Sequence, residues 1–150
     1  MIKIIIFGLT LVLGVAALYY FQLRGGENPT SVLTVGAKRI SVEIADTLPK
    51  QILGLSGRES LCADCGMIFV YRNPQNQNFT MRGMKFSLDM IFIRDGAVVE
   101  TMTNVPFPKS GEEPMVVRSR EDADMVLEVT AGFVREQGLG VGDKVELERR

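Results

Sequence analysis

The order of apolar and polar side chains predicts a body made mostly of β-strands. Residues 31–35 and 39–45 alternate apolar and polar side chains over short runs, as a strand with one buried face does. Asp95-Gly96 separates two later runs and favours a tight hairpin turn, because such a turn needs positive φ. Further strands are expected at residues 67–71, 88–93, 98–105, 125–130 and 144–148. Turn signals roughly every eight to twelve residues indicate a sandwich or barrel.

Two short helices are expected among these strands. Asp46 or Thr47 can cap the first helix, which runs to Leu55 and tolerates Pro49 in its opening turn. The second helix covers residues 131–137 and ends at a glycine. Because the helices are short and few, the sequence predicts a mainly β fold and not alternating βαβ units.

The amino-terminal part of the chain has a different character. Residues 4–21 contain no charged residue and no proline, and as a helix they would rise about 27 Å, close to the thickness of a bilayer core. Lys3 and the free amino terminus favour leaving the near end in the cytoplasm. We therefore expect residues 1–23 to be a signal anchor, residues 24–30 a linker, and residues 31–150 a single β-rich domain outside the cytoplasm.

A cleaved signal peptide is the alternative interpretation of this segment. Val15-Ala16-Ala17 places small residues at a possible cleavage site after an apolar stretch of suitable length. Cleavage there would leave the apolar run Leu18-Tyr19-Tyr20-Phe21 as a new terminus, so the uncleaved anchor is favoured. Both interpretations export the body, which would be membrane-anchored in the first case and secreted in the second.

The amino-acid composition limits the partners and catalytic groups that the body can have. The chain has 150 residues with 17 Lys and Arg against 18 Asp and Glu, and the charges are scattered singly along the body. A nucleic-acid partner is not expected, because binding phosphates requires a basic patch. Histidine is absent, which removes the commonest general base and the commonest metal ligand. We expect no metal and no cofactor.

A series of short motifs gives the body a resemblance to a known family. In order and spacing the series is similar to the family called domain of unknown function 192, and it comprises Gly54-Leu55-Ser56-Gly57-Arg58, Leu61, Gly66-Met67-Ile68-Phe69-Val70-Tyr71, Phe79-Thr80-Met81-Arg82, Leu88-Asp89-Met90-Ile91-Phe92-Ile93, Val126-Leu127-Glu128-Val129, Ala131-Gly132 and Gly140-Val141-Gly142-Asp143. The resemblance implies a compact, jelly-roll-like β fold and no established activity. Members usually carry threonine in place of Met84 and proline in place of Ser87.

The resemblance carries over Arg58, Arg82 and Asp89 as candidate ligand-binding residues. Asp89 lies in the most apolar strand of the chain, where an unpaired carboxylate would cost several kcal/mol. On a structural interpretation, Asp89 pairs with Arg58 or Arg82, or caps backbone amides. On a functional interpretation, an arginine beside it holds an anionic or hydroxyl-rich ligand. Sequence alone leaves both interpretations open.

Cys62-Ala63-Asp64-Cys65 is the other conspicuous feature. In an exported body, Cys62 and Cys65 are expected to form a local disulfide that holds the loop before the strand at residues 67–71. A redox-active pair is the alternative, although such pairs stand at the start of a helix and this one precedes a strand. A zinc site would need two further ligands.

These observations give three hypotheses for function. The leading one is a membrane-tethered binding or accessory domain, which would take a small ligand or a protein partner near Arg58, Arg82 and Asp89. The second is an enzyme, either a thiol-disulfide catalyst using Cys62 and Cys65 or a carboxylate-dependent hydrolase or lyase using Asp89. The third is a structural component of a membrane complex.

Overall fold

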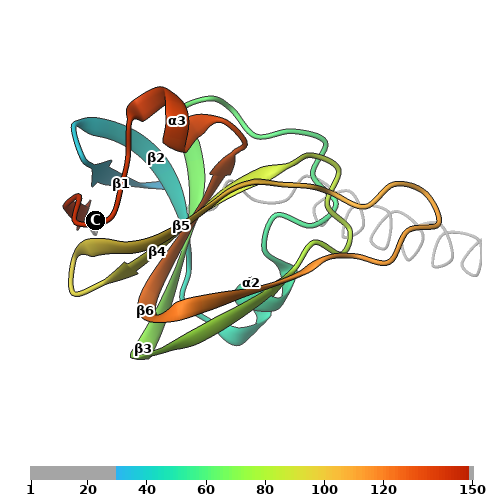
Figure 1. The fold of residues 1–150 in the computed structure, drawn as a ribbon, viewed down its shortest axis with the longest axis horizontal. Coiled ribbons are helices and arrows are strands. Elements are labelled where there is room, and N and C mark those ends of the chain that lie inside the picture. The colour runs from blue at the N-terminus through green and yellow to red at the C-terminus, as the bar shows by residue number, and fades with distance from the viewer. Residues whose placement is uncertain (1–29, 149–150) are drawn as a thin grey trace, which may run out of the picture.

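Seven strands form one continuous sheet in the computed structural model, which describes residues 30–148 (Figure 1). The strand order is β5-β4-β6-β3-β2-β1-β7, and every neighbouring pair is antiparallel except β2 and β3. The strands are β1 Thr30–Val35, β2 Lys38–Ala45, β3 Cys65–Thr80, β4 Leu88–Arg94, β5 Ala97–Val105, β6 Val116–Thr130 and β7 Val145–Glu148. Two short helices lie within the described residues, α2 Leu48–Leu53 and α3 Phe133–Gln137. The prediction of a mainly β fold with short helices is confirmed.

The expected membrane segment at residues 4–21 lies outside the described residues, so the anchor and the alternative signal peptide stay predictions. The expected linker, residues 24–30, overlaps the described part by one residue, because Thr30 already belongs to β1. Neither helix within residues 30–148 has the length and apolar character that crossing a bilayer requires.

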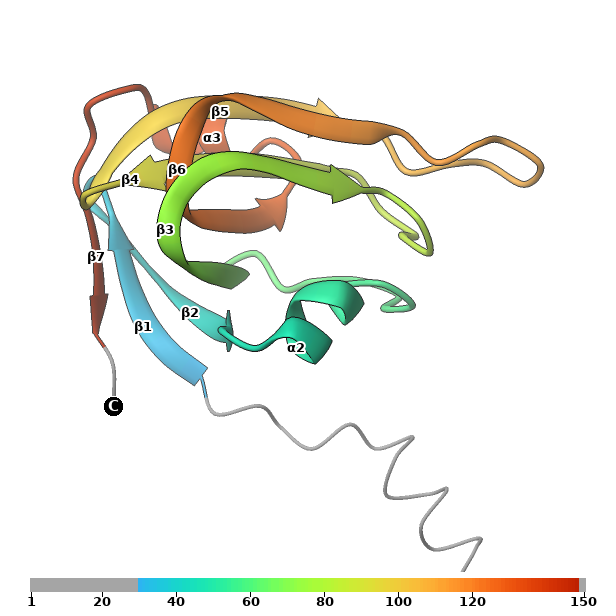
Figure 2. The same ribbon diagram turned by 90° about the horizontal axis from the view of Figure 1, so that it is seen from below.

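The two edges of the sheet meet at one point. Ala97, at the start of β5, forms an antiparallel bridge with Lys144 just before β7. On either side of this bridge, the Val145 amide donates to the Gly96 carbonyl at 2.8 Å and the Val98 amide donates to the Asp143 carbonyl at 2.9 Å. The sheet therefore curls until the start of its edge strand β5 meets the residue before its other edge strand, β7. Figure 2 shows this meeting point beside the β4–β5 turn.

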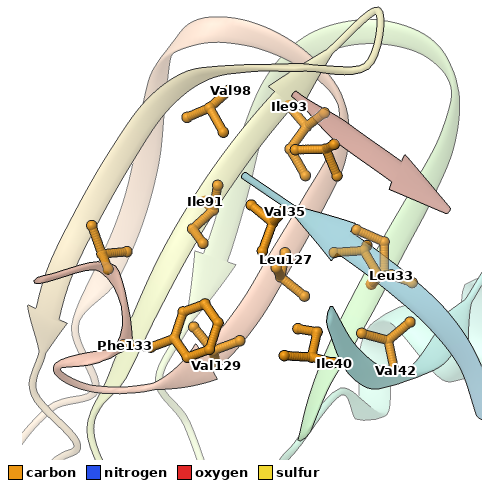
Figure 3. Packing of buried hydrophobic residues seen from close by; sticks show 13 residues of the cluster. Leu33, Val35, Ile40, Val42, Ile91, Ile93, Val98, Leu127, Val129 and Phe133 are labelled. Carbon is orange, nitrogen blue, oxygen red and sulfur yellow. The ribbon is translucent and has the colours of Figure 1, made fainter. Parts of the chain in front are cut away.

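Two apolar cores lie on opposite faces of the central strands β4, β6 and β3. The first core is enclosed between these three strands and β1, β2 and β7, and it includes Leu33, Val35, Ile91, Leu127 and Val129 (Figure 3). The second lies on the other face and includes Met67, Phe69, Met90, Phe92 and Val126. Because both faces are covered, β4 is buried from Leu88 to Ile93, which explains its unbroken apolar sequence.

β3 and β6 extend well beyond the expected strands at residues 67–71 and 125–130. Their added parts pair with each other, with Gln75 opposite Ala123 and Phe79 opposite Val117. The β3 register shifts between Val70 and Gln75, and this part of the strand is polar and mostly exposed. Because the extension lacks a regular alternation of apolar and polar side chains, its sequence does not predict a strand. The extension curves back on the side of the sheet where α2 lies (Figure 2), and Phe79 in it packs against the second core.

Candidate functional site

Asp89 is engaged entirely with backbone amides of its own chain. One oxygen, Oδ1, accepts from the Asn104 amide at 2.8 Å. The other, Oδ2, accepts from the Gly132 amide at 3.0 Å and the Val134 amide at 2.9 Å. Asp89 is fully buried, so this carboxylate joins β4 to β5 and to the start of α3. Of the alternatives left open by the sequence, the structure shows amide capping.

The two candidate arginines lie in adjoining loops, and neither pairs with Asp89. Arg58 forms a two-pronged ion pair with Glu43, in which Nη1 meets Oε1 and Nη2 lies 2.8 Å from Oε2. The hydrogen bond to Glu43 raises the pKa of Arg58 further. Arg82 is exposed, and its carbonyl accepts from the Ser56 hydroxyl at 2.9 Å. The structure thus does not assemble Arg58, Arg82 and Asp89 into one site.

Cys62 and Cys65 form the expected disulfide, with their Cα atoms 5.1 Å apart. Cys65 is the first residue of β3, and the Asp64 carbonyl accepts from the Ser41 amide of β2 at 2.9 Å. The disulfide therefore stabilises the turn that starts β3 beside β2. The pair leads into a strand, so the helix terminus that activates a redox cysteine is missing at this point. No group of three metal-ligating side chains occurs within residues 30–148.

A cavity of about 460 Å³ opens between α2, the extension of β3 and the loop that follows it. Figure 2 shows α2 on the same side of the sheet as the far half of β3, and both contribute residues to the wall of this cavity. Its inner wall belongs to the second core and includes Leu55, Phe69, Met81, Met84 and Leu88. Its outer rim is made of the exposed apolar side chains of Ile52 and Leu53 and of the amide side chains of β3.

Glu128 is a buried carboxylate in the wall of this cavity. It stands on β6 directly between Met67 of β3 and Met90 of β4, on the apolar face of the second core. Only 5% of the residue is exposed, and within residues 30–148 no hydrogen bond or ion pair engages its side chain. Burial raises the pKa of Glu128 from 4.5 to about 8. Through this cavity the carboxyl group can contact solvent or a ligand.

Three aromatic side chains of β3 share the cavity with Glu128. The Phe69 and Phe79 rings meet edge to face, with centroids 5.0 Å apart and planes at 87°. Tyr71 also lines the cavity, and its pKa is raised to about 12, first by burial and then by the charge of Glu128. Gly54 brings the end of α2 to this cluster, because a Cβ on that glycine would lie 3.4 Å from the Phe69 ring.

Two of the amide side chains that line the cavity are held by backbone carbonyls. The Gln51 Nε2 donates to the Ala45 and Val70 carbonyls at 3.2 and 3.0 Å, which occupies both of its hydrogens. The Gln77 Nε2 donates to the Ala123 carbonyl at 2.9 Å. Among the described residues that line the cavity, Glu128 alone carries a carboxyl group, and none is a lysine or arginine. The site is therefore acidic and aromatic, with amide side chains in its wall.

The sequence contains a signal for Glu128 as well as for Asp89. Asp89 is a candidate because a carboxylate in an apolar strand needs a partner. Glu128 satisfies the same criterion, since Met125, Val126, Leu127 and Val129 surround it in the sequence. The sequence does not show that Asp89 has amide partners, whereas Glu128 has none in the part of the chain that the structure describes.

A single curled sheet of seven strands with two short helices places residues 30–148 in the class of small, mainly β domains. Within that class the chain belongs to the DUF192 family, described as "Uncharacterized ACR", whose model matches residues 31–147. The family resemblance predicted from the sequence is thereby confirmed. Curated proteins give no match to the chain.

Two solved structures have similar folds. One, from Sinorhizobium meliloti 1021, is described as a candidate transcription regulator, and it is 28% identical with a TM-score of 0.72. That likeness covers 80% of this chain and 95% of the other. The second is a protein of unknown function from Novosphingobium aromaticivorans DSM 12444. It is 31% identical with a TM-score of 0.69, covering 78% of this chain and 84% of the other.

Proposed function

We propose that this protein is a binding domain that takes up a small ligand in the cavity beside Glu128. The observation that carries the proposal is a carboxylate that is 5% exposed, lines a cavity of about 460 Å³ and has no partner among the described residues. The binding hypothesis from the sequence is kept, and its site moves from Arg58, Arg82 and Asp89 to Glu128.

The energetics of burial support a ligand role for Glu128. A buried carboxylate without hydrogen bonds destabilises a fold by several kcal/mol, whereas an apolar side chain of similar size would stabilise it. Asp89 avoids this penalty because backbone amides donate three hydrogen bonds to it. No residue between 30 and 148 donates a hydrogen bond to the Glu128 side chain, so its partner is expected to be a ligand.

The two enzyme hypotheses receive less support than binding. Asp89 is fully buried and its oxygens are engaged with amides, which leaves no lone carboxylate for proton transfer to a substrate. Cys62 and Cys65 hold the start of a strand, without the helix terminus that lowers a thiol pKa.

A structural role in a membrane complex is the second candidate, and α2 favours it. Leu48, Ile52 and Leu53 are 68%, 75% and 64% exposed, and no residue of the helix is buried. Ile52 and Leu53 also line the cavity, so an apolar ligand part would cover two of these three side chains. This overlap makes the exposed helix compatible with ligand binding.

The leader supports membrane attachment with the body outside the cytoplasm. Residues 4–21 are uncharged and long enough to span a bilayer as a helix. Protease added to intact spheroplasts that express the full chain tests this placement: the body should be digested without lysis. Protection of the body until lysis would contradict it. Nucleic acid is not included in the proposal, because the sequence lacks a basic patch.

Small molecules that co-purify with the full chain test the binding proposal. The wild type, Glu128→Gln and Glu146→Gln would be purified in a maltoside detergent, denatured, and their released small molecules compared by mass spectrometry. Glu146 is exposed on β7 and is not part of the cavity wall, so it provides the same chemical change as a control. A molecule released by the wild type and the control, and depleted in Glu128→Gln, is expected. Equal release from all three, or from none, would overturn the proposal.

A further inference from the structure

We infer that the ligand of this cavity is an organic ammonium cation, bound with its nitrogen between the Glu128 carboxylate and the aromatic rings of β3. This inference rests on the proposed function and adds the ligand class. It is carried by a conjunction of three features in one cavity: an unpaired acid, a cluster of aromatic side chains and the lack of any basic side chain in the described wall.

The charge of the cavity decides the sign of the ligand. Glu128 is the one carboxyl group among the described residues that line it, and no lysine or arginine stands beside it there. A phosphate or carboxylate ligand would find no basic side chain in this wall to balance its own charge and would repel any ionised Glu128. A cation instead supplies the partner that the buried carboxylate lacks.

The aromatic side chains add a second attraction for a cation. Met67, Phe69 and Tyr71 alternate along β3 on one face of the sheet, and Met67 lies directly opposite Glu128. Phe69 is thus one diagonal step from the acid and is 1% exposed, whereas Phe79, which packs edge to face against it, and Tyr71 are half-buried and can meet a ligand. Aromatic faces attract ammonium groups, most strongly where water is excluded.

The amide oxygen of Gln51 fits the same ligand class. Gln51 has both amide hydrogens engaged with backbone carbonyls, so its oxygen is the atom left to a ligand, whereas the Asn78 oxygen already accepts from Arg118. A protonated amine would donate to the Gln51 oxygen, and a methylated ammonium would place its methyl groups against the rings. Both forms share the positive nitrogen on which the inference rests.

The size of the cavity indicates that the ammonium group is part of a larger molecule. A volume of about 460 Å³ exceeds what one ammonium head fills. Ile52 and Leu53 at the rim are 75% and 64% exposed, and an apolar ligand body leaving the cavity would cover them. The expected ligand is an amphipathic amine or alkylammonium compound.

Proton release is a consequence of this assignment. Burial raises the pKa of Glu128 to about 8, so at neutral pH the empty cavity holds the protonated acid. Binding of the cation converts the carboxylic acid to carboxylate, and the proton leaves to the solvent. Below a pH of about 8, affinity for the cation should therefore rise with pH, because less work is needed to remove that proton.

Calorimetry on the full chain in a maltoside detergent tests the inference with three matched probes. Choline carries a methylated nitrogen, ethanolamine a protonated one, and dimethylbutanol replaces the charged nitrogen of choline by carbon. We expect at least one of the cations to bind about tenfold or more tighter than dimethylbutanol. Glu128→Gln should remove this preference and Glu146→Gln should retain it. Phe79→Leu should weaken cation binding about threefold or more.

Two outcomes would overturn the inference, and they bear differently on the proposed function. If dimethylbutanol binds as tightly as both cations, and Ile52→Trp at the cavity rim weakens all three probes, the cavity binds ligands without selecting a cation. In that case the proposed function stands and the ligand class is wrong. If none of the probes binds, the cation assignment fails, and the co-purification comparison decides the proposed function by itself.

Discussion

Asp89 and Glu128 lie on neighbouring strands of one sheet, and both are buried, yet they face different cores. Asp89 stands opposite Val129 on the side of the first core, where it accepts three hydrogen bonds from backbone amides. Glu128 stands opposite Met90 on the side of the second core, without a partner in the described chain. One acid stabilises the fold, and the other is available to a ligand.

The first prediction concerns pH and Glu128. The folded pKa of about 8 exceeds the unfolded value of 4.5, so the folded state retains a proton that the unfolded state loses between these values. The free energy of unfolding should therefore fall, by a few kcal/mol, as pH rises from about 4.5 to about 8. Glu128→Gln should remove this pH dependence of the free energy of unfolding and should be more stable than the wild type at pH 8. Urea unfolding curves across this pH range measure the free energy of both proteins.

Glu146→Gln is the control for that titration, because Glu146 is exposed on β7 and its replacement should leave the pH dependence unchanged. If Glu128→Gln and the wild type lose stability in parallel between these pH values, Glu128 is not a buried, unpaired acid.

The second prediction concerns Asp89. In Asp89→Asn one oxygen is replaced by an amide nitrogen, which has no lone pair for the amides of Asn104, Gly132 or Val134. The variant should lose about 2–4 kcal/mol of stability, as expected when charge-assisted hydrogen bonds to a buried acid are broken. Denaturant unfolding at neutral pH measures the loss. A variant as stable as the wild type would show that the capping bonds contribute little.

Gly66 gives the third prediction, about the sheet beneath the cavity. A Cβ at this position would lie 2.9 Å from Leu127 Cδ1 and 3.0 Å from the Glu128 carbonyl oxygen. Gly66→Ala should therefore separate β3 from β6 and lower stability by about 1–3 kcal/mol. Gly140→Ala, where no atom lies within 4 Å of the added carbon, is the matched control. Equal thermal midpoints for the two variants would contradict the close approach.

The fourth prediction separates the disulfide from the binding site. Reduction, or Cys62→Ser with Cys65→Ser, should lower stability by about 2 kcal/mol, because the closed loop is short. Neither cysteine lines the cavity, so the small molecules retained by the purified chain should not change. Unfolding curves with and without reductant, together with mass spectrometry of released molecules, measure both effects. Loss of the ligand on reduction would place the disulfide in the binding mechanism.

Strand positions could be predicted because each short run carries its own pattern. The alternation in residues 39–45 reflects the packing of Ile40, Val42 and the partly buried Ile44 of β2 against the first core. The Asp95-Gly96 turn was also predictable, and the structure gives the two residues φ angles of 53° and 73°. Both features depend on residues close together in the sequence.

The cavity was not predictable in the same way, because it is made by segments distant in the sequence. The β3 extension contains Pro74 and a run of amides, with no apolar alternation to indicate a strand. Only its pairing with β6 shows that it covers the second core. The partners of Asp89 are backbone amides, which no side-chain pattern reveals.

The side-chain carboxyl of Glu128, followed by carbon-detected NMR as pH is changed, gives the most direct test of the central claim. With the cavity emptied, we expect a titration midpoint of about 8, moving to lower pH when a bound cation stabilises the carboxylate. A midpoint near 4.5, unchanged by any added ligand, would mean that Glu128 is already solvated or paired. That result would contradict the assignment of this cavity as the binding site.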